Sequence, residues 1–223
     1  MTEHARTFIQ ARMSSRRFPG KVLAPFRGRP MIQSVIERAV NALPHVPVVL
    51  LTSTDPTDDP LCAFVEWLKI PCFRGPLDDV LERFRTCARA YPCEWILRLC
   101  ADSPLLNADV LRFAFEQATK PWDVVTTTRP RTLPKGHNCE LFRVGALETA
   151  ASQPLTREER EHVTESFYRR GDTFRVLNVG ATTSEFANHG LAIDSLEDWQ
   201  RLSALDDREL ARFSYDLRVI PGA

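Results

Sequence analysis

Short apolar segments alternate with segments of helical periodicity along most of the chain. The apolar segments have the length of buried strands, and they are residues 7–10, 47–51, 95–99, 124–127, 139–143, 174–179 and 191–193. Alternation of this kind is typical of a parallel or mixed sheet with helices on both faces. The pattern therefore predicts an α/β fold.

Three of the intervening segments carry clear signals for the start of a helix. Pro30 suits a first helical position, and the apolar residues after it recur at helical spacing. Asp79 with Glu82 and Ser195 with Asp198 have the spacing of capping boxes, in which a side chain accepts a hydrogen bond from a backbone N–H three residues on. We expect one helix to begin at each of these three positions.

The length and composition are those of a single globular domain, residues 1–223. The chain is 43% hydrophobic and 26% charged, which is ordinary for a folded protein. Residues 129–136 contain two prolines and several basic side chains, and this composition predicts a loop. After the loop, we expect residues at about 138–172 to form a small excursion from the domain, which would serve acceptor binding or dimerisation.

The balance of charge and the absence of long apolar runs exclude two kinds of partner. Lys and Arg together number 29, as do Asp and Glu, so the chain has no basic excess for binding nucleic acid. No apolar run approaches the length of a membrane span, and no secretory signal follows the polar N-terminus. We therefore expect a cytoplasmic protein with reduced cysteines and with neither nucleic acid nor membrane as a partner.

The loop after the first predicted strand concentrates positive charge. Arg12, Arg16, Arg17 and Lys21 lie within residues 10–21. Four adjacent cations repel one another unless an anion joins them, and guanidinium and ammonium groups bind phosphate oxygens well. The loop therefore favours a triphosphate site, with a solvated basic loop as the alternative. It matches neither the P-loop pattern nor the G-x-G-x-x-G pattern.

Two aspartates follow predicted strands. Asp102 and Asp194 are each expected at the carboxyl end of a strand, where ligands collect in open α/β sheets. Two carboxylates together with phosphate oxygens are suitable ligands for Mg²⁺. The alternative is that each aspartate caps the following helix, but Asn107 and Ser195 are available for that role.

The sequence resembles a known family in several blocks. Ala11-Arg12 with Ser15, Arg17 and Pro19-Gly20-Lys21 is similar to the signature loop of the acid-sugar cytidylyltransferases, the CMP-Kdo and acylneuraminate synthetases. The similarity is greatest to their spore-coat polysaccharide biosynthesis relatives. Further blocks follow in the order that this group shows, at residues 54–60, 73–75, 78–81, 98–105, 160–164 and 193–198.

The resemblance implies a nucleotide-diphospho-sugar transferase fold, which is GT-A-like and Rossmann-like. It also implies CTP as the donor, Mg²⁺ as the cofactor and a sugar or sugar-acid acceptor for surface polysaccharide biosynthesis. The residues expected to hold the nucleotide or its triphosphate are Ala11, Arg12, Ser15, Arg17 and Lys21. The resemblance places Mg²⁺ on Asp102 and Asp194, and the catalytic set is Lys21, Arg12 and Asp102.

Five further residues are expected near the substrates. Arg74 and Asp79 are predicted to approach the nucleotide, although Asp79 is equally explained as a helix cap. Cys100 is predicted to line the nucleotide pocket or to be structural. Glu140 and His162 are predicted to contact the acceptor, with His162 lying on a helix.

The expected reaction is an in-line attack by an acceptor oxygen on the α-phosphorus, with pyrophosphate as the leaving group. Two alternatives stay open from the sequence. A glycosyltransferase would need a D-x-D metal motif, which is missing from the sequence, and a non-catalytic nucleotide-binding module would not need both aspartates. A homodimer is also left open.

Overall fold

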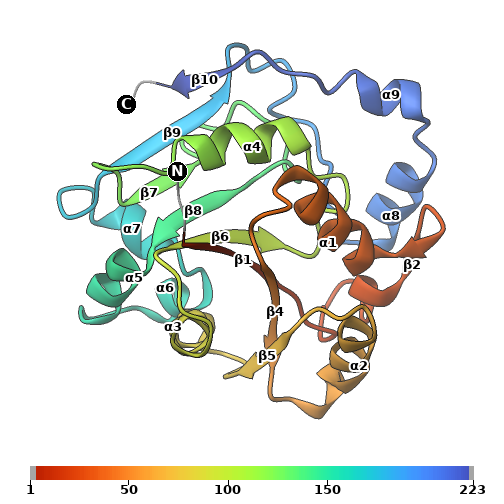
Figure 1. Cartoon of the computed structure of the whole chain (residues 1–223). Helices are drawn as coiled ribbons and strands as arrows, with labels where there is room; N and C mark the ends of the chain where they lie inside the picture. The colour runs from red at the N-terminus through yellow and green to blue at the C-terminus, as the bar shows by residue number, and fades with distance from the viewer. Residues whose placement is uncertain (1–3, 221–223) are drawn as a thin grey trace.

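The computed structural model describes residues 4–220 and is built around one mixed sheet (Figure 1). The strand order is β10-β9-β7-β8-β6-β1-β4-β5. Only β8 and β10 run antiparallel to their neighbours, so the predicted mixed, mostly parallel sheet is confirmed. The strands are β1 (Ala5–Gln10), β4 (Val48–Ser53), β5 (Cys72–Gly75), β6 (Trp95–Cys100), β7 (Val124–Thr126), β8 (Glu140–Arg143), β9 (Val176–Ala181) and β10 (Leu217–Ile220), with β2 (Pro25–Phe26) and β3 (Arg29–Pro30) in a separate hairpin.

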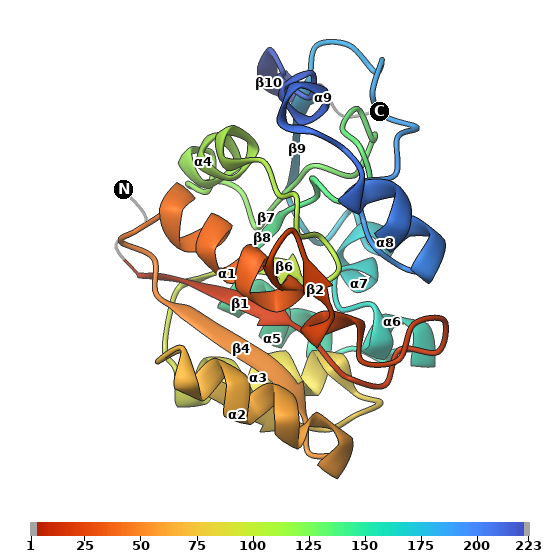
Figure 2. The ribbon, with the colours of Figure 1, turned by 90° about the vertical axis from the view of Figure 1, so that its right-hand side faces the viewer.

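Helices cover both faces of the sheet (Figures 1 and 2). Side chains alternate along the strands, so that Ile9 and Leu50 pack with α1, α2 and α4, whereas Phe8 and Val49 pack with α3 and α5. No helix within residues 4–220 is long and apolar enough to cross a bilayer. The α-helices are α1 (Met31–Ala42), α2 (Asp59–Trp67), α3 (Val80–Ala90), α4 (Ala108–Glu116), α5 (Val144–Ala151), α6 (Arg157–Glu161), α7 (Glu165–Arg169), α8 (Leu196–Ser203) and α9 (Asp207–Ala211), with 3-10 turns η1 (Lys21–Leu23) and η2 (Pro56–Asp58).

The predicted helix starts are found with one small correction. The Asp79 carboxylate accepts a hydrogen bond from the Glu82 N–H at the start of α3, and Ser195 with Asp198 forms a complete capping box at α8. Pro30 does not open α1 as predicted. Its backbone is extended, with φ −54° and ψ 140°, and it immediately precedes the helix.

The predicted strand at residues 191–193 is wrong. The Leu191 N–H donates to the Lys135 carbonyl at 2.6 Å, and the Ile193 N–H donates to the Asp102 carbonyl at 2.8 Å. The backbone of this segment is therefore bonded to two loops and not to a neighbouring strand. Its apolar side chains are buried all the same, which explains the misleading pattern. These bonds place the residue after Ile193 beside Asp102.

Residues 138–172 begin inside the sheet. Strand β8 lies between β6 and β7, with Arg98 opposite Glu140. Helices α5, α6 and α7 follow, and α5 and α6 both contact α3. This segment thus completes one side of the molecule next to the ends of β1 and β6.

Candidate active site

A cleft of about 1020 Å³ opens at the carboxyl ends of β1 and β6. Its walls are the loop after β1, the loop after β6, the start of α3 and the α6 region. After β1 the chain forms β4 and β5 on one side and then β6 on the other, so the cleft lies at the switch point where open α/β sheets bind ligands. The cleft brings together these predicted residues: Ala11, Arg12, Ser15, Arg17, Lys21, Cys100, Asp102, His162 and Asp194.

The loop of residues 11–21 is held by a buried carboxylate. Asp58 accepts hydrogen bonds from the Met13 N–H at 2.7 Å and from the Ser53 N–H at 3.0 Å, as well as from the Ser53 hydroxyl. Burial opposes ionisation of Asp58, but these bonds outweigh it and lower its pKa. Gly20, at φ 72°, closes the loop through an N–H bond to the Met13 carbonyl.

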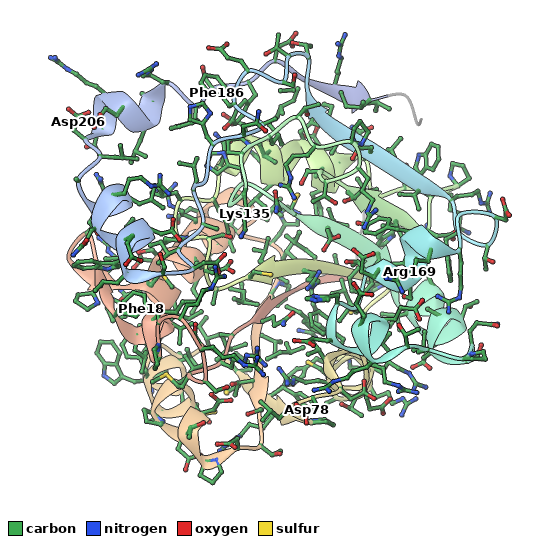
Figure 3. All side chains as sticks on the ribbon, turned by 180° about the vertical axis from the view of Figure 1, so that it is seen from behind. Phe18, Asp78, Lys135, Arg169, Phe186 and Asp206 are labelled. Carbon is green, nitrogen blue, oxygen red and sulfur yellow. The ribbon has the colours of Figure 1, made fainter. Side chains whose placement is uncertain are left out.

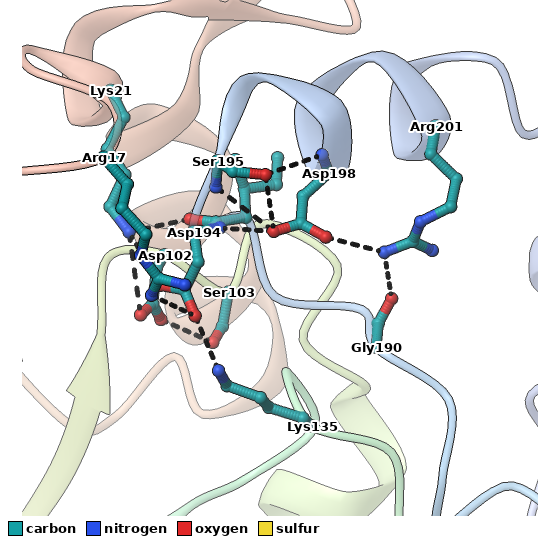
Figure 4. Close-up of polar contacts among 11 residues, drawn as sticks. Arg17, Lys21, Asp102, Ser103, Lys135, Gly190, Asp194, Ser195, Asp198 and Arg201 are labelled. Carbon is teal, nitrogen blue, oxygen red and sulfur yellow. Dashed lines mark hydrogen bonds and ion pairs between the residues drawn. The ribbon is translucent and has the colours of Figure 1, made fainter.

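Lys21 lies between the two aspartates (Figure 4). Its side chain is largely buried, and Nζ donates to the Ile193 carbonyl at 2.7 Å and to Asp194 Oδ1 at 3.2 Å. The same Nζ is 3.9 Å from Asp102 Oδ2. One ammonium group therefore joins both predicted metal ligands to the loop of residues 11–21.

Asp194 is surrounded by cations. Its Oδ2 lies 2.6 Å from Lys135 Nζ and 3.2 Å from Arg17 Nη2, while Oδ1 faces Lys21. Burial alone would raise the pKa of Asp194, but the ammonium groups of Lys135 and Lys21 outweigh it and lower the pKa to about 2. The carboxylate is therefore ionised at neutral pH.

Neither aspartate caps a helix. Asn107 accepts the N–H bonds at the start of α4, and Ser195 does so at α8. Asp102 accepts a bond from the Ser103 hydroxyl at 3.0 Å, and otherwise faces the cleft and Lys21. The capping alternative is therefore wrong for both residues.

Two predicted nucleotide residues lie outside the cleft lining. Arg74 donates to the Ser53 and Asp55 carbonyls and pairs with Asp59 at 2.6 Å, so it holds the turn between β4 and α2. Asp79 caps α3 and pairs with Arg160 at 2.7 Å. Asp79 therefore supports the wall formed by the start of α3, whereas Arg74 has a structural role beside the cleft.

Glu140 lies in a buried polar network behind the cleft. It pairs with Arg98 Nη1 at 2.6 Å and accepts a hydrogen bond from the Tyr168 hydroxyl. Arg98 Nη2 in turn donates to Gln10 Oε1 at 3.3 Å, and Gln10 lines the cleft. The structure thus connects Glu140 to the cleft through Arg98 and Gln10.

His162 and Cys100 both line the cleft. The prediction that His162 lies on a helix is wrong, because α6 ends at Glu161 and His162 has φ −108° and ψ 60°. Burial raises the pKa of the Cys100 thiol to about 11. Cys100 is therefore protonated at neutral pH and is not an activated nucleophile.

Sequence reasoning missed several residues that line the cleft. Arg83 is fully buried, and it donates to the Pro76 and Leu77 carbonyls. It lies on the inner face of α3, where a charged residue is not expected, so the helical pattern gave no signal for it. With Arg157, the lining holds six cationic side chains against four carboxylates, an excess that an anionic ligand can balance.

A family model described as cytidylyltransferase matches residues 7–211. The chain belongs to the cytidylyltransferase family. The predicted family and enzyme class are thereby confirmed, and neither alternative class gains support from this match. Spore coat polysaccharide biosynthesis protein SpsF of Bacillus subtilis is 28% identical over 207 residues, which cover 88% of this chain and 84% of that protein.

Two solved structures extend the similarity. A cytidylyltransferase from Leptospira borgpetersenii superposes with a TM-score of 0.86 at 26% identity, covering 94% of this chain and 92% of that one. A CMP:2-keto-3-deoxy-manno-octonic acid synthetase complexed with CTP superposes with a TM-score of 0.68 at 19% identity, covering 92% and 99%. The second similarity shows a shared fold, which agrees with the predicted Rossmann-like nucleotidyltransferase architecture.

Proposed function

We propose that this cytidylyltransferase transfers CMP from CTP to a hydroxyl group of a sugar-acid acceptor, releases pyrophosphate and uses Mg²⁺. The observation that supports the proposal is the meeting of Asp102 and Asp194 with Lys21 and Arg17 at one end of the cleft. Carboxylates for a metal and cations for a triphosphate are the two sets of groups that this reaction needs.

The triphosphate would lie along the loop of residues 11–21. Arg12 and Arg16 line the cleft, and neither forms an ion pair within the part of the chain that the structure describes. They are therefore free to bind phosphate oxygens. Arg17 and Lys21 are held at Asp194, at the same end as the proposed metal, and would contact the leaving pyrophosphate.

Asp102 and Asp194 would hold the Mg²⁺. Their carboxylates lie within 4 Å of the same ammonium nitrogen, and anionic oxygens are the ligands that this ion prefers. Residues 4–220 contain no cluster of three or more metal-ligating side chains, so phosphate oxygens and water would complete the coordination. The ion would neutralise charge on the phosphates as the bond to the leaving group breaks.

The rest of the chain would position the charge of Lys21 and the acceptor. Lys21 is fixed by the Ile193 carbonyl, so its charge is already in place when CTP binds. Arg157, Glu161 and His162 line the cleft from the α6 region and would contact the acceptor. Arg157 would pair with the acid group of such an acceptor. The proton of the attacking hydroxyl would leave to solvent as its oxygen bonds to the α-phosphorus and pyrophosphate departs.

Pyrophosphate release with CTP, ATP, GTP or UTP and a panel of acidic and neutral sugars tests the proposal. We expect release with CTP and an acidic sugar, together with a CMP-sugar of the matching mass. Preference for another nucleotide would contradict the base assignment and leave the reaction class intact. Release without any CMP-sugar would contradict the transfer itself.

A further inference from the structure

Lys135 reaches Asp194, a residue of the cleft lining, from a loop that the fold holds in place. Its N–H donates to the His189 carbonyl at 3.1 Å, and its carbonyl accepts from the Leu191 N–H at 2.6 Å. The next residue, Gly136, has φ +107°, and a Cβ there would lie 2.4 Å from the Leu191 carbonyl carbon. Only glycine allows the backbone at residue 136 to pass this close to the backbone of Leu191, so the position of the chain beside Lys135 is tightly defined.

The side chain of Lys135 ends on one carboxylate oxygen of Asp194. Lys135 Nζ lies 2.6 Å from Asp194 Oδ2, and Figure 4 shows it on the side of Asp194 away from Asp198. Asp198 is turned toward the backbone of Ser195 and toward Arg201, so it does not compete for Lys135. In Figure 3, Lys135 lies on the opposite side of β1 and β6 from Asp78.

Both oxygens of Asp194 are therefore occupied by cations. Oδ1 faces Lys21, and Oδ2 faces Lys135 and Arg17. With Asp102, this end of the cleft holds three positive and two negative side chains. A free divalent ion would add two positive charges where positive charge is already in excess, whereas a triphosphate reverses the sign of the site.

We propose that Lys135 occupies the position on Asp194 that the metal needs, so that the metal binds with the triphosphate and not before it. The proposal rests on the metal site of the proposed function. In the nucleotide complex, Lys135 leaves Asp194 Oδ2 and its charge turns to a phosphate oxygen. More than half of its side chain is exposed, at 56%, so this movement needs no change in the core.

Mn²⁺ binding measured by electron paramagnetic resonance tests this order without relying on activity. Wild type is compared with Lys135→Gln and with Lys69→Gln, which removes the same charge from an exposed site outside the cleft lining. We expect Lys135→Gln alone to bind Mn²⁺ at least roughly tenfold more tightly without nucleotide. Lys135→Arg keeps the charge and should bind as weakly as wild type.

Repeating the Mn²⁺ measurement with an α,β-methylene analogue of CTP distinguishes a wrong role for Lys135 from a wrong metal site. With the analogue bound, we expect the Mn²⁺ affinity of wild type to be within about threefold of the Mn²⁺ affinity of Lys135→Gln. Equal Mn²⁺ affinity of the two proteins without nucleotide, with tight binding in the analogue complex, would overturn the role of Lys135 and leave the metal site standing. Weak binding by both proteins with the analogue would overturn the metal site and this proposal together.

Discussion

Acidification should destabilise the protein through one buried histidine. His137 is 3% exposed, and its Nδ1 lies 2.8 Å from the Tyr215 hydroxyl, with the rings of Tyr215 and Phe213 edge-on to it. Burial lowers its pKa from 6.5 to about 4, and the charge of Arg38 acts in the same direction. The folded protein therefore keeps this imidazole neutral at a pH at which the unfolded chain protonates it.

The sign and size of the effect follow from proton linkage. Between about pH 6.5 and about pH 4 the unfolded chain binds more protons at His137, so stability is complete above this window and falls as the pH falls through it. The pKa difference corresponds to a loss of about 2 kcal/mol by about pH 5 and about 3 kcal/mol by about pH 4. That is a large part of the ~5–15 kcal/mol that stabilises a typical domain.

Urea unfolding followed by tryptophan fluorescence at about pH 7.5 and about pH 5 measures this loss. His137→Gln keeps a donor and an acceptor but does not titrate. We expect the free energy of unfolding of wild type to fall by about 2 kcal/mol more than that of His137→Gln between the two conditions. An equal fall in both proteins would refute the reasoning. So would a histidine resonance of His137 that titrates near its ordinary pKa in the folded protein.

The sequence predicted the parts of the fold that depend on local pattern. Strand β4 begins as a continuous apolar run and β6 is interrupted only by Arg98, so both strands follow from the sequence. The starts of α3 and α8 follow from their capping side chains. Strand β5 was missed because its four residues include Arg74 and Gly75 and show no alternation. Strand β10 was missed because it is a short edge strand with partly exposed side chains.

The candidate site was predictable where its residues follow strands. The loop after β1 and Asp102 could be placed from the sequence, because parallel strands bring their carboxyl ends to one edge. Asp194 was placed correctly for the wrong reason, since backbone bonds to loops hold it there and not a strand. Lys135 and Arg83 reach the site through tertiary contacts alone, for which spacing gives no signal.

Three further predictions concern single residues in or behind the cleft. Lys21→Ala and Arg17→Ala should each weaken CTP binding by roughly tenfold or more and CMP binding by less than about threefold in calorimetric titrations, because their partners are the outer phosphates; equal losses would place them elsewhere. Cys100→Ala should keep kcat within about threefold, because the thiol is protonated, and a loss beyond about tenfold would contradict this. Glu140→Gln leaves the buried Arg98 guanidinium without its carboxylate partner and should lower the free energy of unfolding by about 3 kcal/mol; an unchanged urea midpoint would show that the pair is not stabilising.

The most direct test of the central claim is turnover of Asp102→Asn and Asp194→Asn at saturating CTP and Mg²⁺ with the acceptor found in the screen. Asparagine keeps the shape of each side chain but removes the charge, so each variant should lose at least roughly a hundredfold in kcat while still unfolding cooperatively. Asp79→Asn is the matched control, because Asp79 caps α3 outside the cleft lining and asparagine also caps well. Near wild-type turnover in Asp102→Asn or Asp194→Asn would contradict the assignment of this cleft as the place where CMP is transferred.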